Sequence, residues 1–407
     1  MNPFKFRPLP LLVALSLTVA AAPAAAGDTL QLLAATPQDL VASRLVMPKS
    51  TPASVATLER APVAVSWPLD GTRALDAEPQ INVTQSREYW IDATEAEIQN
   101  GVRLPLSATG ALVRLSPHDG KSAIAEADVQ IRVNGKRIDN AKAIDTLANS
   151  DDLHAAGMDV PGGSVILRMG KSVRGDLQLS VPTARGAYLV HVFEPASPVV
   201  LALKAERDSI VGGDPVAFRA TIEGATLERI GGLLSAPDGA SQNVDFTRQA
   251  DGSYVGSVTP DLAHAGAEGL WEIHAFGVST GKDGVPRDAR SAFAVSVPVA
   301  RLDGRVSQSK SNAQGGALSL RIGVEARTAS RYALSGVLYG TDADGKLQPV
   351  AMAQSAAWLP AGRGTIDLRY DAASLSLGAP WEVRDLRLLN QADFSLQERR
   401  ARALAWR

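Results

Sequence analysis

The chain has 407 residues, of which 41 are Lys or Arg, 43 are Asp or Glu, and none is Cys. The absence of cysteine excludes disulfides, thiolate catalysis, cysteine-ligated zinc and iron–sulfur clusters. Lys5 and Arg7 belong to a predicted leader, and without them 39 basic residues face 43 acidic ones. A slightly acidic chain with no basic motif beyond its Arg-rich end argues against nucleic-acid binding.

The first residues have the features of a secretory signal peptide. Basic residues precede an apolar run from Leu9 to Ala22, and a run of small residues ends at Ala26 before Gly27. We expect cleavage between Ala26 and Gly27, which would leave a periplasmic or extracellular protein. The apolar run is shorter than the ~20 residues that span a bilayer, which weighs against an uncleaved anchor. No cysteine follows the site to carry a lipid, and no later segment is apolar enough to be transmembrane.

Residues 27–75 form an N-terminal segment rich in Ala, Pro, Ser and Thr. Its composition predicts a segment that is extended or loosely packed, with one short helix from Thr36 to Arg44. An apolar run from Val63 to Trp67 then precedes the first folded domain.

Residues 76–198 are predicted to form an N-terminal β-rich domain. Thr94 and Glu97 fit a capping box at the start of a helix, and Asn134-Gly135 is the strongest hairpin signal in this part of the chain. The segment Ser150–Gly157 has acidic residues in its first turn and a final glycine, which predicts a capped short helix.

Residues 199–300 follow the stiff, Pro-containing linker Glu194–Pro198 and have the pattern of an immunoglobulin-like β-sandwich. Turn signals occur at Asp238-Gly239 and Asp251-Gly252, and Thr259 is the expected cap of a helical turn. Apolar residues alternate with polar ones along the clearest strand, at Val216, Phe218, Ala220 and Ile222.

Residues 301–407 have the same pattern and predict a second immunoglobulin-like sandwich. The tail from Ser395 to Arg407 is predicted to be a final strand with exposed guanidinium groups. The core-facing sets of two further strands are Leu318, Leu320, Ile322 and Val324, and Ile366, Leu368 and Tyr370.

Several short motifs in these domains resemble known bacterial families. The second domain is similar to immunoglobulin-like modules found beside secreted proteases and anchored surface proteins, through Gly212–Val216, Pro237–Gly239, Asp251–Tyr254 and Gly269–Ala275. The first and third resemble an uncharacterised, signal-bearing gammaproteobacterial "domain of unknown function" family, through Tyr89–Asp92, Gly110–Pro117 and Pro380–Leu388. The resemblance implies a fold of one β domain followed by two such modules, and an export route, without any catalytic residue.

No motif in the sequence predicts a catalytic residue, a metal ligand or a cofactor. Asp342-x-Asp344-Gly345 favours a hairpin turn over a calcium loop, since Lys346 stands where a third oxygen ligand is needed. The acidic cluster of Asp92, Glu95 and Glu97 is better explained by helix capping than by paired-carboxylate catalysis. The histidines lack the paired spacing of helical zinc sites; they are His118, His154, His191, His264 and His274.

Three aromatic residues of the last domain are candidates for a ligand surface: Tyr339, Trp358 and Trp381. Exposed rings there would act as stacking platforms, whereas large aromatics in sandwiches more often belong to the core. The sequence therefore favours an exported, non-enzymatic structural or protein-interaction protein without a cofactor. One alternative is a glycan- or protein-binding, adhesin-like module. The other is a hydrolase whose N-terminal domain brings His118, His154 or His191 against carboxylates.

Overall fold

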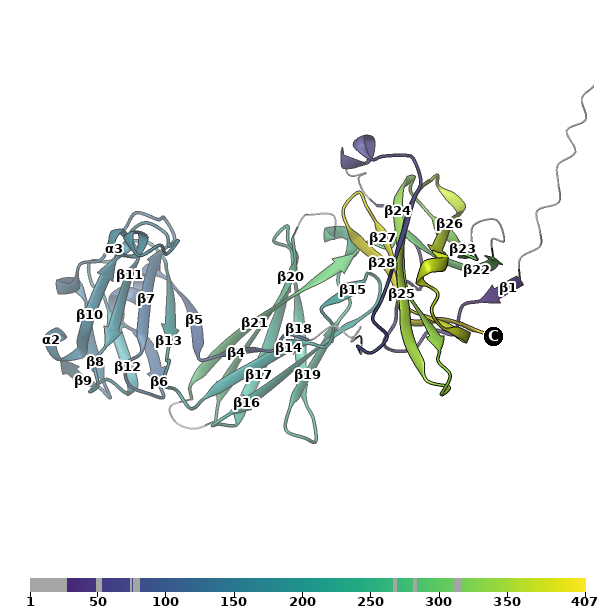
Figure 1. Ribbon diagram of the computed structural model, residues 1–407. Coiled ribbons are helices and arrows are strands. Elements are labelled where there is room, and N and C mark those ends of the chain that lie inside the picture. Colours follow the sequence, from purple (N-terminus) through teal and green to yellow (C-terminus); the bar gives the residue numbers. More distant parts are fainter. Residues whose placement is uncertain are drawn as a thin grey trace, which may run out of the picture.

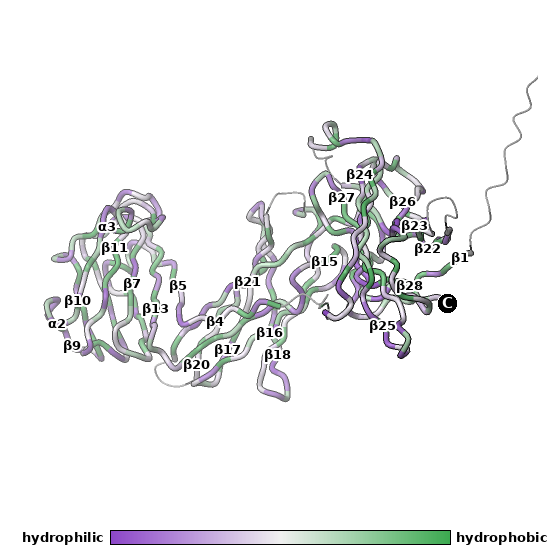
Figure 2. The backbone as a smooth tube through the Cα atoms, viewed as in Figure 1, coloured by the Kyte–Doolittle hydropathy of each residue, from purple (hydrophilic) through white to green (hydrophobic). Residues whose placement is uncertain are grey.

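The structure is a computed structural model that describes residues 28–48, 53–73, 75, 81–265, 269–280, 284–310 and 316–407. The predicted leader and its cleavage site, Ala26 and Gly27, lie outside the described residues. Three β-rich domains follow one another in a row (Figure 1). Hydrophobic and hydrophilic residues alternate along many of their strands, as half-buried strands require (Figure 2).

The first domain packs two antiparallel sheets around one core. One sheet has the order β10-β11-β7-β13-β5 and the other β6-β12-β8-β9. The strands of the domain are β5 (Glu88–Ala93), β6 (Val102–Leu106), β7 (Leu112–Pro117), β8 (Gln130–Val133), β9 (Lys136–Ile138), β10 (Ile144–Asn149), β11 (Val165–Met169), β12 (Gly175–Ser180) and β13 (Tyr188–Phe193). Its helices are α1 (Glu95–Asn100), η2 (Glu126–Asp128), α2 (Asn140–Ala143) and α3 (Ser150–Ala155).

Local sequence signals in this domain are confirmed. Thr94 accepts a hydrogen bond from the Glu97 N–H, and the Glu97 side chain bonds back to the Thr94 N–H, which completes the capping box of α1. Asn134 and Gly135 have φ values of 50° and 78° at the turn between β8 and β9, the left-handed conformation that a two-residue hairpin needs. Helix α3 is capped by Asn149.

The second domain is an immunoglobulin-like sandwich. Strands β21, β20 and β17 form one sheet, strands β19, β16, β14 and β4 form the other, and β18 pairs with both. Its elements are β4 (Thr84–Ser86), β14 (Val200–Ala205), β15 (Ser209–Val211), β16 (Val216–Glu223), β17 (Leu227–Ser235), β18 (Ser241–Arg248), β19 (Tyr254–Val258), η3 (Leu262–His264), β20 (Trp271–Ser279) and β21 (Pro286–Ser296). The predicted cap Thr259 is wrong, because the Asp261 side chain accepts from the Ala263 N–H instead and caps η3.

The third domain is also a sandwich, and three of its strands come from the other end of the chain. One sheet has the order β1-β22-β23-β26 and the other β2-β28-β27-β24-β25-β3. The elements from the C-terminal part are β22 (Ala300–Lys310), β23 (Leu318–Ala326), β24 (Ser330–Thr341), β25 (Leu347–Leu359), β26 (Gly362–Tyr370), η5 (Ala372–Ser374), β27 (Gly378–Asn390) and β28 (Ser395–Trp406).

The N-terminal segment is therefore not loosely packed. We call its strands β1 (Asp28–Gln31), β2 (Leu40–Val41) and β3 (Val63–Pro68) the N-terminal strap. Each strap strand pairs antiparallel with the third domain, β1 with β22, β2 with β28 and β3 with β25. In Figure 1 the purple strap lies over the yellow and green third domain. The short helix η1 (Ala53–Thr57) lies between β2 and β3 in the sequence.

The helix predicted from Thr36 to Arg44 does not form. Its first turn is present, because the Asp39 carboxylate accepts from the Thr36 N–H at 2.7 Å and the Asp39 N–H donates to the Thr36 carbonyl at 3.0 Å. The chain then enters β2, where Leu40 faces Arg399 of β28. Tertiary strand pairing thus overrides a local helix-start signal after one turn.

The exposed guanidinium groups predicted for the tail are wrong in part. The tail is the strand β28, as expected, but Arg399 and Arg400 are buried. Arg399 donates to Asp385 at 3.0 Å and Arg400 to Glu398 at 2.6 Å, so each buried cation has a carboxylate. The Arg402 side chain remains largely exposed.

We predict that Asp39→Ala loosens the strap. Asp39 is buried, and its second carboxylate oxygen accepts from the Ala401 N–H of β28 at 2.6 Å. Loss of these acceptors should lower the free energy of unfolding by about 1–3 kcal/mol, measured by urea denaturation. The neighbouring Gln38 is exposed, so Gln38→Ala should change it by less than about 0.5 kcal/mol. Equal effects of the two substitutions would contradict this role of Asp39.

Candidate functional site

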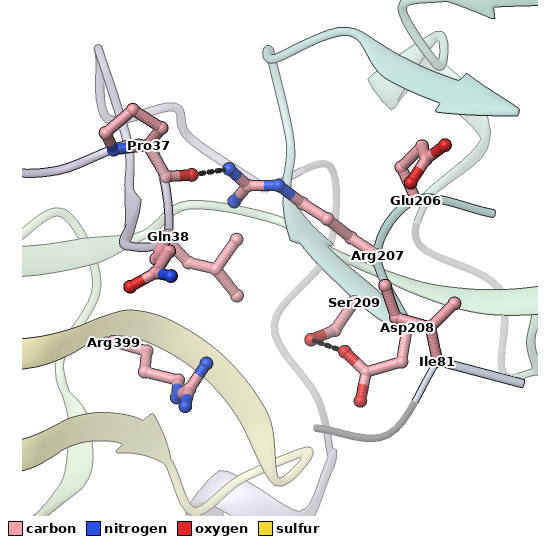
Figure 3. A pocket seen from close by; sticks show the side chains of 9 residues that line it. Pro37, Gln38, Ile81, Glu206, Arg207, Asp208, Ser209 and Arg399 are labelled. Carbon is pink, nitrogen blue, oxygen red and sulfur yellow. Dashed lines mark hydrogen bonds between the residues drawn. The ribbon is translucent and has the colours of Figure 1, made fainter. Parts of the chain in front are cut away.

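A pocket of about 210 Å³ lies where the strap, the second domain and the third domain meet. Arg207 crosses it and donates to the backbone carbonyl of Pro37 (Figure 3) and, at 3.0 Å, to that of Asp39. Arg399 forms part of its wall. Arg207 donates to carbonyls of the chain between β1 and β2. We therefore interpret the pocket as part of the contact between the N-terminal segment and the second domain.

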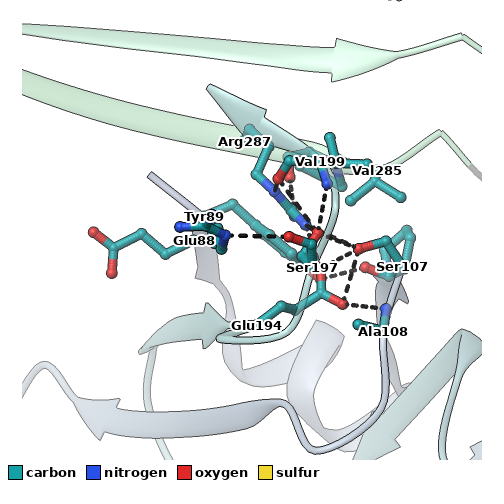
Figure 4. A network of polar contacts seen from close by, with 12 residues as sticks. Glu88, Tyr89, Ser107, Ala108, Glu194, Ser197, Val199, Val285 and Arg287 are labelled. Atoms are coloured by element: carbon teal, nitrogen blue, oxygen red, sulfur yellow. Dashed lines mark hydrogen bonds and ion pairs between the residues drawn. The ribbon is translucent and has the colours of Figure 1, made fainter. Parts of the chain in front are cut away.

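The first and second domains are joined by a buried ion pair (Figure 4). Arg287 of β21 and Glu194, which follows β13, are both fully buried, with Nη2 and Oε2 2.5 Å apart. Arg287 also donates to the Ser197 hydroxyl at 2.7 Å and to the Val199 carbonyl at 2.9 Å. Glu194 accepts from the Ala108 N–H at 2.8 Å. The linker Glu194–Pro198 is therefore part of a fixed joint.

The joint also makes a sheet continuous across the two domains. Glu88 of β5 pairs with Asp288 of β21, and the Trp90 N–H donates to the Asp288 carboxylate at 2.9 Å. The order β13-β5-β21-β20 thus runs from one domain into the next. Side chains on one face of these four strands can meet although they belong to two domains.

A group of polar and aromatic side chains gathers on the outer face of this junction. Tyr89 of β5 and Ile273 of β20 point into their domain cores, so their neighbours in each strand point outward. The register places Trp90 opposite His191. We call the following residues the junction cluster: Glu88, Trp90, His191, His274, Phe276, Asp288 and Arg290.

Trp90 is the centre of the junction cluster. The His191 ring stacks on it at 5.1 Å with an interplanar angle of 11°, and His274 approaches edge-on at 5.6 Å and 89°. The Arg290 guanidinium lies 5.1 Å from the Trp90 ring centroid, within cation–π range. Phe276 contacts His274 at 5.7 Å and is 46% exposed. Both domains therefore contribute to one aromatic and cationic surface.

Two carboxylates sit beside the imidazoles. His191 Nε2 donates to Glu88 at 2.8 Å, and this hydrogen bond lowers the pKa of Glu88 against the opposing effect of its partial burial. His274 Nε2 lies 3.5 Å from Asp288, and it is a buried atom without a hydrogen-bond partner among the described residues. The junction cluster therefore contains one buried nitrogen, His274 Nε2, whose hydrogen-bonding capacity no described residue uses.

The aromatic residues predicted as a ligand surface do not form one. Tyr339 and Trp381 are each only 8% exposed, because they lie in or beside the third-domain core. Trp358 is half-buried, and the Arg60 guanidinium lies 3.9 Å from its ring centroid. Arg384 lies 4.5 Å from the Tyr339 ring centroid. The rings are packed by their own chain.

The other residues that the sequence offered as candidates form hydrogen bonds within their own domains. Asp342 accepts from the backbone of Asp344 and Lys346 at 3.0 and 2.8 Å, which makes a hairpin turn. His118 bonds the exposed Asp92 at 3.2 Å, His154 bonds the Val160 carbonyl, and His264 bonds Asp238. Within the described part of the chain, no three His, Asp or Glu residues are grouped to hold a metal ion. No helix there combines the length and the apolar character needed to cross a membrane.

Sequence reasoning missed the junction cluster because its two halves lie far apart in the chain. The available signal was the period-2 alternation, which places Trp90 and His191 outward on their strands. That alternation does not reveal that β5 pairs with β21, so His274 and Arg290 could not be assigned to the same surface.

We predict that Arg287→Met strongly destabilises the joint between the domains. Glu194 would remain buried without its cation, which typically costs about 3–5 kcal/mol in the free energy of unfolding. Arg290 on the same strand pairs with Glu272 at 3.5 Å, and both side chains are largely exposed. Arg290→Met should therefore cost less than about 1 kcal/mol in the same urea titration. Comparable losses in the two variants would contradict the anchoring role of Arg287.

A second prediction concerns the acid dependence of Glu88. A carboxylate with a lowered pKa stabilises the fold above its ordinary pKa of about 4.3, and that contribution is lost as the pH falls through the lowered pKa. In His191→Ala the pKa of Glu88 should rise toward its ordinary value, as measured by NMR titration of the carboxyl carbon. The pKa of Glu97 is lowered by the Thr94 cap and should stay unchanged. If the pKa of Glu88 does not change in His191→Ala, the coupling between Glu88 and His191 is refuted.

Two family models and one solved structure relate most of the chain to one group of proteins. The DUF4785 (domain of unknown function) N-terminal domain matches residues 54–194, and the DUF4785 C-terminal domain matches residues 303–407. A crystal structure of a DUF4785 family protein from Legionella pneumophila has 20% identity and a TM-score of 0.70, with 90% of this chain and 98% of that chain covered. No curated protein matches.

Two weaker likenesses do not bear on the fold. A Salmonella alpha-2-macroglobulin mutant has 14% identity and a TM-score of 0.26, with 80% of this chain and 22% of that chain covered. A tetra-tandem repeat in the extending region of a large adhesion protein has 12% identity and a TM-score of 0.18, with coverages of 80% and 74%. The family matches span more than half of the sequence, and the chain therefore belongs to the DUF4785 family.

Proposed function

We propose that this chain is an exported, non-enzymatic protein-interaction protein of the bacterial envelope or secretome, and that it binds a protein partner through the junction cluster. The observation that carries the proposal is the position of Trp90, half-buried on a face built by two domains and flanked by Arg290 and the exposed Phe276. Trp and Arg in a fixed, partly desolvated setting are the residue types that dominate protein–protein binding energies.

A protein partner fits this surface better than a glycan. A sugar stacks on a free ring face, whereas the Trp90 ring already carries the stacked His191 and the Arg290 guanidinium. The exposed Phe276 offers an apolar contact, and the Arg290 side chain, which is 54% exposed, offers hydrogen-bond donors on the same face. Such a mixed patch suits a protein surface with an apolar anchor and a hydrogen-bonding rim.

The non-enzymatic part of the proposal rests on how the imidazoles are held. The hydrolase alternative needs a histidine against a carboxylate in a cleft, and His118 and His191 do meet Asp92 and Glu88. His118 and Asp92 are exposed at the surface, and His191 is stacked on Trp90. Neither pair lines the pocket at the strap. These settings favour recognition over proton transfer.

The export part rests on the leader predicted from residues 1–26. Cell fractionation with an antibody to the mature chain tests it, by comparing cytoplasm, periplasm, membranes and culture supernatant. We expect the protein in the periplasm or the supernatant. A purely cytoplasmic protein would overturn the export proposal and leave the binding proposal standing.

We predict that a photo-crosslinking residue at position 276 captures a discrete protein partner in cells. The matched control is the same residue at position 394, because Phe394 is 77% exposed on the third domain, away from the cluster. Trp90→Ala should reduce the crosslink at position 276 at least about tenfold, as expected for loss of a hot-spot ring. Equal products from both positions, or a yield that Trp90→Ala leaves unchanged, would refute the binding role of the junction cluster.

A further inference from the structure

Strand β3 of the N-terminal strap forms an exposed apolar sheet edge. It pairs with β25 on one side, and no described strand is hydrogen-bonded to its other side. Val63 and Val65 are each 48% exposed and Trp67 is 38% exposed. Alternate residues of a strand share a face, so these three side chains lie in one row. An exposed edge of this kind readily pairs with a further strand.

The register shows which backbone groups the open edge offers. Pro68 faces Ala351, and the next residue, Leu69, donates its N–H to the Val350 carbonyl at 2.9 Å. Opposite residues in antiparallel strands alternate between those that exchange hydrogen bonds and those that do not. Val63, Val65 and Trp67 therefore turn their N–H groups toward β25, and Ala64 and Ser66 turn theirs toward the open edge.

Two prolines limit this edge symmetrically. Pro62 and Pro68 are each two residues from Ala64 or Ser66, so their backbone groups also face the open edge. Neither proline carries an N–H. The sequence from Pro62 to Pro68 thus has two outward donors around a central Val65, with a proline three residues away on each side. Such a segment is complementary to a second copy of itself that runs in the opposite direction.

We propose that two copies of this chain associate through antiparallel pairing of their β3 strands about a two-fold axis at Val65. Ala64 of each copy then lies opposite Ser66 of the other, so that every outward N–H finds a carbonyl. Val65 faces its own counterpart and Val63 faces Trp67, so the three exposed side chains of each copy contact those of the other on one face. Pro62 faces Pro68, and this pair exchanges no hydrogen bond because neither residue has an N–H, so the ladder ends there.

Charges beyond the strand ends agree with this register. Arg60 precedes Val65 by five residues and Asp70 follows it by five, so the two-fold axis brings Arg60 of one copy to the end where the other copy presents Asp70. Arg60 and Asp70 are both exposed; the Arg60 guanidinium lies on the Trp358 ring, and the Asp70 carboxylate accepts from Thr72. The antiparallel register brings opposite charges to the same end of the paired strands, whereas a parallel arrangement would bring like charges together. This inference uses residues distinct from the junction cluster and does not depend on the function proposed above.

Single-cysteine variants test the two-fold axis directly, because the chain contains no cysteine. Opposite residues that are not hydrogen-bonded have Cα atoms about 4.5 Å apart, which suits a disulfide. Val65→Cys in the otherwise unchanged mature chain should form a disulfide-linked dimer under mild oxidation. Val63→Cys is the matched control, since Val63 has the same exposure and its two copies would lie about 13 Å apart. We expect Val65→Cys to crosslink at least about tenfold faster. Equal rates, or no dimer from Val65→Cys, would overturn the proposal.

A backbone variant tests the hydrogen bonds of the same edge. Ala64→Pro removes an outward N–H and spares the pairing with β25, because proline is tolerated where the N–H faces away from the ladder. In sedimentation equilibrium its dimer dissociation constant should be at least about tenfold higher than that of the unmodified protein. Ala64→Ser keeps the N–H and should associate as the unmodified protein does. A monomeric unmodified protein, or association that Ala64→Pro leaves intact, would overturn the proposal, and a β3 edge occupied by another protein would do the same.

Discussion

The open edge of a β-sheet is the constraint around which this chain is arranged. An edge exposes backbone N–H and C=O groups that must be paired, covered or kept from other strands. The third domain leaves β22, β25 and β28 to be paired by the N-terminal strap, so the first described residues complete the last domain. The edge strand β14 of the second domain is paired in the same way by β4, which lies between the strap and the first domain in the sequence. The chain therefore runs along the third and second domains before it builds the first.

A buried charge pair holds the first and second domains together. Desolvating Arg287 and Glu194 is costly, and their mutual attraction offsets that cost only if the remaining donors and acceptors are satisfied. Ser197, Val199 and Ala108 supply those partners from the linker and the first domain. All these bonds are made in the arrangement of the two domains that the structure shows. A fixed junction is what allows side chains of two domains to form one preorganised surface around Trp90.

Local structure was predictable from the sequence, and long-range pairing was not. The Thr94 capping box, the Asn134-Gly135 hairpin and the alternating strands depend on residues close in sequence, and they form as expected. The turn at Thr36 also formed, but β28 determined what followed it. Arg399 and Arg400 look like surface residues in a charged tail, and they are buried because Asp385 and Glu398 lie beside them in the folded sheet. The strap and the junction cluster arise from the same kind of contact between distant segments.

Pairing an edge with a new strand moves the edge outward rather than removing it. Strand β2 is short, and its Leu40 packs with Val211 of the second domain, so that the new edge is covered. Strand β1 is also short and ends in the polar residue Gln31. Strand β3 is longer and apolar, and its open side offers two donors between Pro62 and Pro68. The segment between the two prolines suits one partner strand of matching length. A two-fold pairing uses the edge of both copies and leaves none for a third, so the apolar edge is closed without templating an open-ended assembly.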